Sequence, residues 1–286
     1  MSIHKIDLHM HSTISDGTDT PEEMLEKVKA AGIDLFSVTD HDAIKACISI
    51  KEILRADCPL FISGVEFSCR DSLGKYHILG YGYDSSAEAI CSLVEEGHSS
   101  RMKKLGMRLD ALREIFGIEF SDKDAAELYA NNNPGKPHIA KLLVKYGFAE
   151  TVNQAFADFL NKAKIPNIYV SPERAISAIL ESGGIPVLAH PSFGSGDETI
   201  MGDEMDERLQ RLIGFGLKGV EAYYSGFSPV MQKEILGFAE KYNLYVTAGS
   251  DYHGENKLVM LGDNNLDDVD QAPAGLHRFL EDVSYR

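Results

Sequence analysis

The histidines and acids of this sequence lie where a fold of alternating strands and helices would build a site. Six of the ten histidines fall inside or at the C-terminal end of a strand-like run, and four acids accompany them: His9, His11, His41, His77, His190 and His253, with Asp16, Asp40, Glu66 and Asp251. The C-terminal ends of parallel strands meet at one face of such folds, and sites form there. Imidazole and carboxylate groups bind transition metals, and this set exceeds what one ion can use. We therefore predict a cluster of two or three divalent ions, and the absence of cysteine from the set favours Zn, Mn or Fe.

Most of these residues, taken singly, also have an ordinary structural explanation. His9 and His11 share one face of a strand, but such a pair is often incidental. Asp16 precedes a glycine and suits a turn, and a lone His77 in an apolar run is usually a core residue. Glu66 differs, because a carboxylate between valine and phenylalanine is costly to bury unless it is paired or binds a metal. The metal hypothesis therefore rests on the whole set.

Three further acids stay open at this stage. Asp7 shares the strand face of His9 and could orient a ligand or make a core hydrogen bond. Asp42 favours a helix N-cap. Two roles are equally supported for Glu221: an acid that orients a metal ligand from outside the site, or a partner in a plain salt bridge.

Seven short apolar or β-branched runs near turns are predicted strands. They cover Ile3–His11, Asp34–Asp40, Leu60–Phe67, Lys75–Tyr83, Ile185–His190, Lys218–Tyr224 and Leu244–His253. Helical patterns lie between several of them, with start signals such as Thr20-Pro21-Glu22-Glu23 and Ser171-Pro172-Glu173. This alternation predicts an α/β fold with parallel strand pairing.

The stretch 86–170 breaks the alternation because it has no convincing strand. It carries four helical patterns, Ala87–Phe116, Asp122–Tyr129, His138–Tyr146 and Val152–Asn161. We expect an all-helical insertion between the fourth and fifth strands, with residues 1–85 and 171–286 forming the remaining domain.

Charge and composition limit the partners. The 286 residues include 28 Lys+Arg and 44 Asp+Glu, a net charge of −16 that repels long duplex nucleic acid. A small phosphorylated ligand held by bound cations is still compatible with this charge. No apolar run is long enough for a membrane span, and no secretory signal precedes the first strand, so we expect a cytoplasmic protein. Four cysteines without a C-x-x-C pair suit reduced thiols.

Seven motifs, taken in order, resemble those of the PHP (polymerase and histidinol phosphatase) superfamily of metal-dependent phosphoesterases. They are H-x-H near the N-terminus, Asp-Gly shortly after it, T-D-H-D, G-V-E-F, H-I-L-G-Y, A-H-P and G-S-D-x-H-G. The resemblance implies a distorted seven-stranded (β/α) barrel with three metals at the C-terminal face. It allots His9, His11, Glu66 and Asp251 to one ion, Glu66, His77 and His190 to a second, and Asp16, His41 and His253 to a third.

The helical insertion is similar to that of the nucleotide-acting branch of this superfamily, which includes nucleoside 3′,5′-bisphosphate phosphatases and 5′-to-3′ exoribonucleases. That branch shows R-P-H in the insertion, whereas this chain has Lys136-Pro137-His138, which keeps a cation without the bidentate fork of arginine. The resemblance implies hydrolysis of a nucleotide phosphomonoester by metal-activated hydroxide, with Asp251 as a catalytic ligand and His253 or His41 protonating the leaving oxygen. We expect Arg101, Lys136 and His138 to bind the rest of the substrate. The alternative explanation for Arg101 is that it belongs to a solvated basic face of its helix.

Three alternatives remain. Histidinol phosphate is a different substrate for the same fold. A metal-dependent amidohydrolase shares the barrel and the H-x-H motif, although no lysine stands where one could be carbamylated at a middle strand end. A non-catalytic, metal-stabilised PHP module is the third, and the complete ligand set argues against it. The sequence does not predict the oligomeric state.

Overall fold

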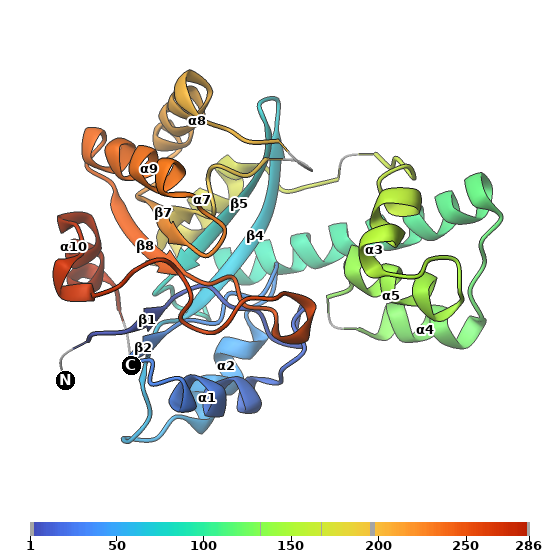
Figure 1. The fold of residues 1–286 in the computed structure, drawn as a ribbon, viewed down its shortest axis with the longest axis horizontal. Coiled ribbons are helices and arrows are strands. Elements are labelled where there is room, and N and C mark those ends of the chain that lie inside the picture. The colour runs from blue at the N-terminus through green and yellow to red at the C-terminus, as the bar shows by residue number, and fades with distance from the viewer. Residues whose placement is uncertain (1–2, 132, 167, 195–197, 285–286) are drawn as a thin grey trace.

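The strands form two sheets in the computed structural model, which describes residues 3–131, 133–166, 168–194 and 198–284 (Figure 1). The first sheet is parallel and has the order β1 (Ile6–Asp7), β2 (Leu35–Phe36), β3 (Leu60–Phe61). The second has the order β4 (Gly64–Asp71), β5 (Gly74–Tyr81), β6 (Ile185–Leu188), β7 (Gly219–Tyr224), β8 (Tyr245–Gly249). The predicted α/β fold class is thus confirmed, but the described strands do not form one closed barrel.

The prediction of parallel pairing throughout was wrong for β5. This strand pairs antiparallel with β4 on one side and with β6 on the other, while β6, β7 and β8 are parallel. Between β4 and β5 lie two residues, Ser72 and Leu73, and so short a connection can join only antiparallel strands. The predicted run Leu60–Phe67 also divides into β3 and β4, which lie in different sheets.

Backbone hydrogen bonds beyond the strand ends join the two sheets along both margins. On one margin, the Leu8 amide donates to the Ala248 carbonyl at 2.9 Å and the Asp251 amide to the His9 carbonyl at 2.8 Å. On the other, the Asp42 amide donates to the Glu66 carbonyl at 2.8 Å. These contacts bring the C-terminal extensions of β1 and β2 next to β8 and β4.

Helices cover the sheets, and some of them begin with a side-chain cap. Thr20 caps α1 (Pro21–Ala30) in a capping box with Glu23, and Ser171 caps α7 (Pro172–Glu181), as the start signals predicted. The other covering helices are α2 (Lys45–Ile53), α8 (Gly202–Gly214), α9 (Pro229–Lys241) and α10 (Ala274–Asp282), with short 3-10 turns at Gly254–Asn256 and Val269–Gln271. Among the described residues, no helix combines the length and apolarity needed to cross a membrane.

The chain between β5 and α7 contains helices and connecting loops, with no named strand among its described residues. It forms α3 (Glu88–Phe116), α4 (Asp122–Ala130), α5 (Lys136–Lys145), α6 (Val152–Ala155) and a π-helical turn, Phe156–Leu160. The first half of α3 packs on the main core through Ile90 and Leu93, and its second half joins a separate apolar cluster that includes Leu112 and Leu143. Figure 1 shows α4 and α5 to one side of the sheets, with α3 running between the two regions. The division into two domains stays a prediction, and its outermost residues, 1–2 and 285–286, lie outside the described ranges.

Gly249, the last residue of β8, allows the two sheet margins to approach closely. A Cβ there would lie 2.2 Å from the His9 Cβ and 2.6 Å from Glu221 Oε1. We predict that Gly249→Ala lowers the free energy of unfolding by about 1–3 kcal/mol, because a methyl group has no space without moving the backbone. Thermal denaturation measures this change.

Gly237→Ala in α9 is the matched control, because nothing lies within 4 Å of a Cβ at that exposed helical position. Alanine should stabilise the helix by up to about 1 kcal/mol there. If both variants melted at the wild-type temperature, the close packing at Gly249 would have no energetic weight.

Candidate metal centre and adjoining cavity

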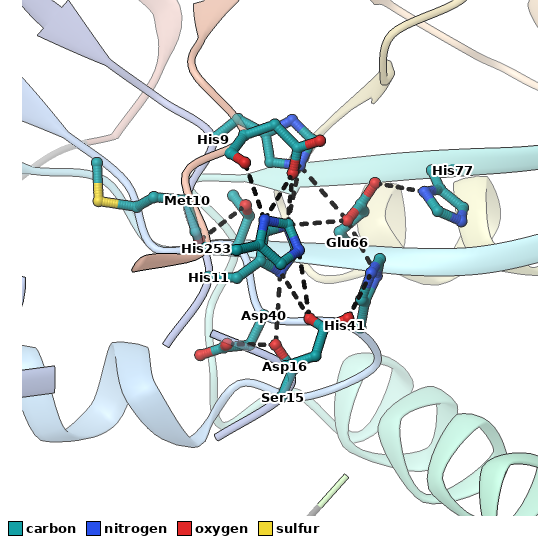
Figure 2. A network of polar contacts seen from close by, with 12 residues as sticks. His9, Met10, His11, Ser15, Asp16, Asp40, His41, Glu66, His77 and His253 are labelled. Carbon is teal, nitrogen blue, oxygen red and sulfur yellow. Dashed lines mark hydrogen bonds and ion pairs between the residues drawn. The ribbon is translucent and has the colours of Figure 1, made fainter. Parts of the chain in front are cut away.

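The nine predicted ligands gather at one end of the two sheets. Figure 2 labels His9, His11, Asp16, His41, Glu66, His77 and His253 among them. Extensions of β1, β2, β6 and β8 supply His9, His11, His41, His190, Asp251 and His253; β4 and β5 supply Glu66 and His77; a loop supplies Asp16. Three groups have one ligand atom per residue within 4.8 Å of one another: His11, Asp16, His41 and His253; His9, His11 and Asp251; His41, Glu66 and His77. Residues 240 positions apart in the chain therefore converge on one site.

Glu66 is at the centre of the cluster and is only 1% exposed. Its two oxygens face different histidines. Oε2 lies 3.0 Å from His41 Nδ1, 3.2 Å from His11 Nε2 and 3.4 Å from His9 Nε2, while Oε1 lies 2.7 Å from His77 Nδ1 and 3.2 Å from His190 Nε2. Figure 2 shows this carboxylate between the ring of His77 and the rings of His11 and His253. A carboxylate placed in this way can bridge two ions.

Asp251 and Asp16 lie on opposite sides of His253. Asp251 Oδ1 is 3.3 Å from His11 Nε2 and 3.4 Å from His253 Nδ1, and Asp16 Oδ1 is 3.4 Å from His253 Nε2. His41 faces both Glu66 and Asp16, the latter at 3.9 Å through Nε2. His11 and His41 thus touch more than one of the three predicted ligand sets, so the geometry does not single out one allotment.

The donor set fits divalent cations. Glu66 Oε2 and His41 Nδ1 are 3.0 Å apart and buried, yet neither makes a hydrogen bond within the described chain, and Asp16 Oδ1 is also buried without one. The Nε2 atoms of His9 and His11 face each other at 3.2 Å. Buried polar atoms normally have partners, and a shared cation would satisfy all of these.

Electrostatics in the cluster favours bound positive charge. Burial opposes ionisation of Glu66, but the charges of His77, His41 and His9 outweigh it and hold the pKa of Glu66 well below its ordinary range. Burial likewise disfavours charged His11, yet the neighbouring carboxylates of Asp251 and Glu66 raise the pKa of His11 to about 9. Metal ions compete with protons for imidazole nitrogens, so a firmly held proton marks a position suited to a cation.

A set of outer contacts orients the ligands. Glu221 Oε1 lies 2.9 Å from His9 Nδ1, and its Oε2 accepts the His190 amide at 2.8 Å. Because both partners are predicted ligands, these contacts favour the orienting role of Glu221 over a plain salt bridge. His190 and Asp251 have φ angles of 27° and 57°, in the left-handed region that ordinary residues avoid. Strain of this kind persists only where the surrounding structure enforces it.

Asp40 and Asp7 have structural partners. The Asp40 carboxylate accepts the Ser12 amide at 2.8 Å and the hydroxyls of Ser12 and Ser15 at 2.6 Å, which organises the loop before Asp16. Asp7 accepts the Ser250 amide at 2.9 Å and the Ser250 hydroxyl at 2.6 Å. Both acids therefore lock the loops that carry ligands.

The predicted substrate residues have diverse surroundings. Arg101 is buried, and its guanidinium pairs with Asp42 at 2.5 Å and donates to Ser68 Oγ at 3.0 Å, so the solvated-face interpretation was wrong. The predicted N-cap role of Asp42 was wrong, because Ile44 precedes α2 and no side chain caps that helix; Asp42 instead pairs with Arg101. Lys136 donates to Asn161 Oδ1 at 3.1 Å. His138 Nδ1 accepts the Gly135 amide at 3.0 Å at the start of α5.

A cavity of about 550 Å³ adjoins the predicted metal ligands and is rich in basic residues. Its lining includes Asp16, His41 and His77 together with seven cationic residues: Arg70, Lys75, Arg101, Lys104, Arg108, Lys136 and Lys164. His138 is not among the lining residues. Burial and the repulsion of Arg101 lower the pKa of Lys104 to about 7, and burial with the repulsion of Arg108 lowers that of Lys136 to about 8. The cavity therefore concentrates positive charge that an anion would stabilise, in a chain of net charge −16.

Of these seven cations, Arg101 and Lys136 were predicted from the sequence. The signal for two others was present, because Arg101, Lys104 and Arg108 follow one another at intervals of three and four residues on one face of α3. All three are buried, whereas the neighbouring Lys103 is exposed.

Comparison with known proteins identifies the family. A family model for the PHP domain matches residues 7–282. This chain belongs to the PHP domain family. It is 30% identical to phosphoribosyl 1,2-cyclic phosphate 1,2-diphosphodiesterase of Eggerthella lenta over 87% of the chain and 94% of that protein. It is also 30% identical to 3′,5′-nucleoside bisphosphate phosphatase of Chromobacterium violaceum, over 87% of each.

Other relatives of this PHP domain protein include an exoribonuclease and solved structures. It is 29% identical to the 5′-3′ exoribonuclease of Haemophilus influenzae over 93% of the chain and 96% of that protein. A Bifidobacterium adolescentis structure, provisionally described as a metal-dependent phosphoesterase, matches with a TM-score of 0.81 and 30% identity, covering 98% of this chain and 96% of that one. A Chromobacterium violaceum structure described as an amidohydrolase with bound sulfate and no metal gives 0.79 and 27%, over 90% of both.

The central position of Glu66 leads to a test of the metal centre in this PHP domain protein. We predict that Glu66→Gln reduces bound metal by at least one equivalent per chain after loading with Mn²⁺ or Zn²⁺, because the amide removes the negative charge shared by five histidines. Elemental analysis of the desalted protein measures this loss. Glu207→Gln, at an exposed position of α8, is the control and should bind metal like the wild type. Equal metal content in all three proteins would contradict a bridging role for Glu66.

Proposed function

We propose that this chain hydrolyses the phosphomonoester of a small nucleotide, such as a nucleoside 3′,5′-bisphosphate or the 5′ end of a short oligoribonucleotide. The observation that carries the proposal is the junction between the carboxylate-bridged histidine cluster and the cavity of buried cations: His41 and His77 belong to both. One part of the site suits the cations that activate water, and the adjoining part suits a second phosphate. The phosphatase and exoribonuclease names of the relatives agree with this substrate class.

The nine clustered residues would hold two or three divalent ions, Mn, Zn or Fe, with Glu66 shared between ions. The family resemblance implies how these residues would be divided among the ions. One ion would be held by His9, His11, Glu66 and Asp251, a second by Glu66, His77 and His190, and a third by Asp16, His41 and His253. Bound ions of this kind lower the pKa of water towards ~7 and neutralise phosphate oxygens.

The chain's own groups would carry out the remaining steps. Asp251 and Glu66 supply negative charge that fixes the cluster, and Glu221 sets the ring of His9. His41 lines the cavity, and both His41 and His253 line the neighbouring hollow of about 230 Å³. With two ions bound and none on the set of Asp16, His41 and His253, either ring could hold a proton near the leaving oxygen. Water attacks phosphorus, the ester P–O bond breaks, and that proton passes to the leaving oxygen.

We assign substrate recognition to residues 86–170. Arg101, Lys104, Arg108 and Lys136 come from this segment and face the cavity that His41 and His77 also line. Lys136 replaces the expected arginine but keeps a cation at the start of α5, and His138 supports that turn. A phosphate of the substrate can pair with these buried cations at little desolvation cost, because they are already removed from water.

Histidinol phosphate fits this cavity less well. Its amine is positively charged near neutral pH and would meet the cations that line the cavity. A nucleoside bisphosphate instead brings a second anion to the same place.

Lys104 gives a direct test of substrate class. We predict that Lys104→Met lowers kcat/KM for a nucleoside 3′,5′-bisphosphate about 10- to 100-fold, since a charge-assisted hydrogen bond contributes about 1.5–3 kcal/mol. Hydrolysis of a simple aryl phosphate should change less than about twofold, because that substrate has no second phosphate. Steady-state kinetics with added Mn²⁺ measures both.

Lys103→Met is the matched control, since Lys103 is the exposed neighbour on the same helix. It should leave both substrates unaffected. An equal fall on both substrates for Lys104→Met would place Lys104 at the scissile phosphate, and no fall on either would remove it from the site. Lack of turnover by the wild type on any phosphomonoester, nucleotide or 5′-phosphorylated oligonucleotide would refute the proposed function itself.

A further inference from the structure

Lys257 lies against the ligand cluster without belonging to it. Its Nζ is 2.5 Å from Asp251 Oδ2, and its side chain is 38% exposed. It lines a hollow of about 230 Å³ together with His41, Glu66, His77, His190, Phe193, Tyr224, Asp251 and His253. The ammonium group therefore borders both solvent and the place where the reacting phosphate would lie.

The two oxygens of Asp251 have separate surroundings. Oδ1 faces the nitrogens of His9, His11 and His253 at 3.3–3.6 Å, on the side of the metal ligands. Oδ2 faces away from them, where it accepts hydrogen bonds from Tyr224 Oη at 2.8 Å and from Lys257 Nζ. Tyr224 alone can hold Oδ2 in place, so Lys257 is free for a second role.

Charge balance indicates when Lys257 would leave Asp251. Asp16, Glu66 and Asp251 carry three negative charges, and two divalent ions carry four positive charges. Once such ions share the charge of Asp251, its attraction for the ammonium weakens, and repulsion between like charges favours movement of the ammonium towards an anion. A phosphate in the hollow would be that anion.

The segment that carries Lys257 allows this movement. It follows the short turn Gly254–Asn256 and lies outside any helix or strand. The next large side chains, Leu258 and Met260, are exposed, at 106% and 74%. Lys257 therefore lies in an irregular segment whose neighbouring side chains are open to solvent.

We propose that Lys257 is a catalytic residue that contacts a non-bridging oxygen of the scissile phosphate and stabilises the negative charge that develops on it. This inference rests on the proposed phosphomonoesterase function and adds a residue to it. No proton leaves Lys257: water forms the new P–O bond, the ester P–O bond breaks, and the ammonium remains charged throughout.

Three variants test the proposal with the full chain loaded with Mn²⁺. In Lys257→Met the charge is removed while the length of the side chain is kept, whereas Lys257→Arg keeps the charge. Tyr224→Phe removes the other donor to Asp251 Oδ2 and reports what loss of positioning alone does. Each protein is measured for bound metal, for the Kd of inorganic phosphate by calorimetry, and for kcat and KM on an aryl phosphate.

We expect Lys257→Met to keep its full metal content, to bind inorganic phosphate about 10-fold more weakly and to lose about 100-fold in kcat, the range seen when one donor to a developing oxyanion is removed. Lys257→Arg should recover most of the phosphate affinity. Loss of metal from Lys257→Met, with phosphate affinity unchanged in the metal-loaded fraction, would make Lys257 a positioning residue for Asp251 and overturn the proposal. Wild-type values throughout would overturn it as well.

The wild type separates this proposal from the function on which it rests. If the wild type hydrolyses the aryl phosphate and Lys257→Met does so equally well, the inference about Lys257 fails and the phosphoesterase function stands. If the wild type neither binds phosphate nor hydrolyses any phosphomonoester, both fail.

Discussion

A buried carboxylate surrounded by imidazoles is the constraint on which the rest of this structure depends. Glu66 is almost fully removed from water, and a charge in that position is stable only with positive partners on both oxygens. Five histidines provide nitrogens for them, from segments that follow or form four different strands. The sheets must therefore bring these strand ends to one point, and the short backbone contacts across both sheet margins do so.

The supporting acids show how the chain holds this arrangement in place. Glu221 contacts both His9 and His190, while Asp40 and Asp7 fasten the loops beside them through serine hydroxyls and backbone amides. These acids accept hydrogen bonds on both oxygens, so they have little capacity left for a metal. The neighbouring ligands, in contrast, include buried atoms without hydrogen bonds. The buried acids thus fall into two groups: some support the surrounding loops and rings, and the others face the predicted metal site.

Sequence reasoning predicted which residues would gather, because each stands at the end of an apolar run and the motifs appear in a known order. It could not predict that His41 would face both Glu66 and Asp16, since ring orientation depends on packing. Parallel pairing of β5 was wrong because β4 continues past the predicted strand end at Phe67 to Asp71, which leaves only Ser72 and Leu73 to connect it to β5. The sequence left a solvated basic face open for Arg101, and the burial of the α3 cations involves residues distant in sequence, such as Tyr169, whose ring lies 3.8 Å from Lys104 Nζ.

The hydrogen bonds that join Leu8 and His9 to Ala248 and Asp251 connect residues that lie about 240 positions apart in the chain. During synthesis on a ribosome, His9 and His11 emerge more than two hundred residues before their partner Asp251 does. Contacts at such sequence separation form late, because a long loop must close first. An unfinished or truncated chain consequently lacks Asp251 and His253, so hydrolytic competence arises only after translation of this region is complete.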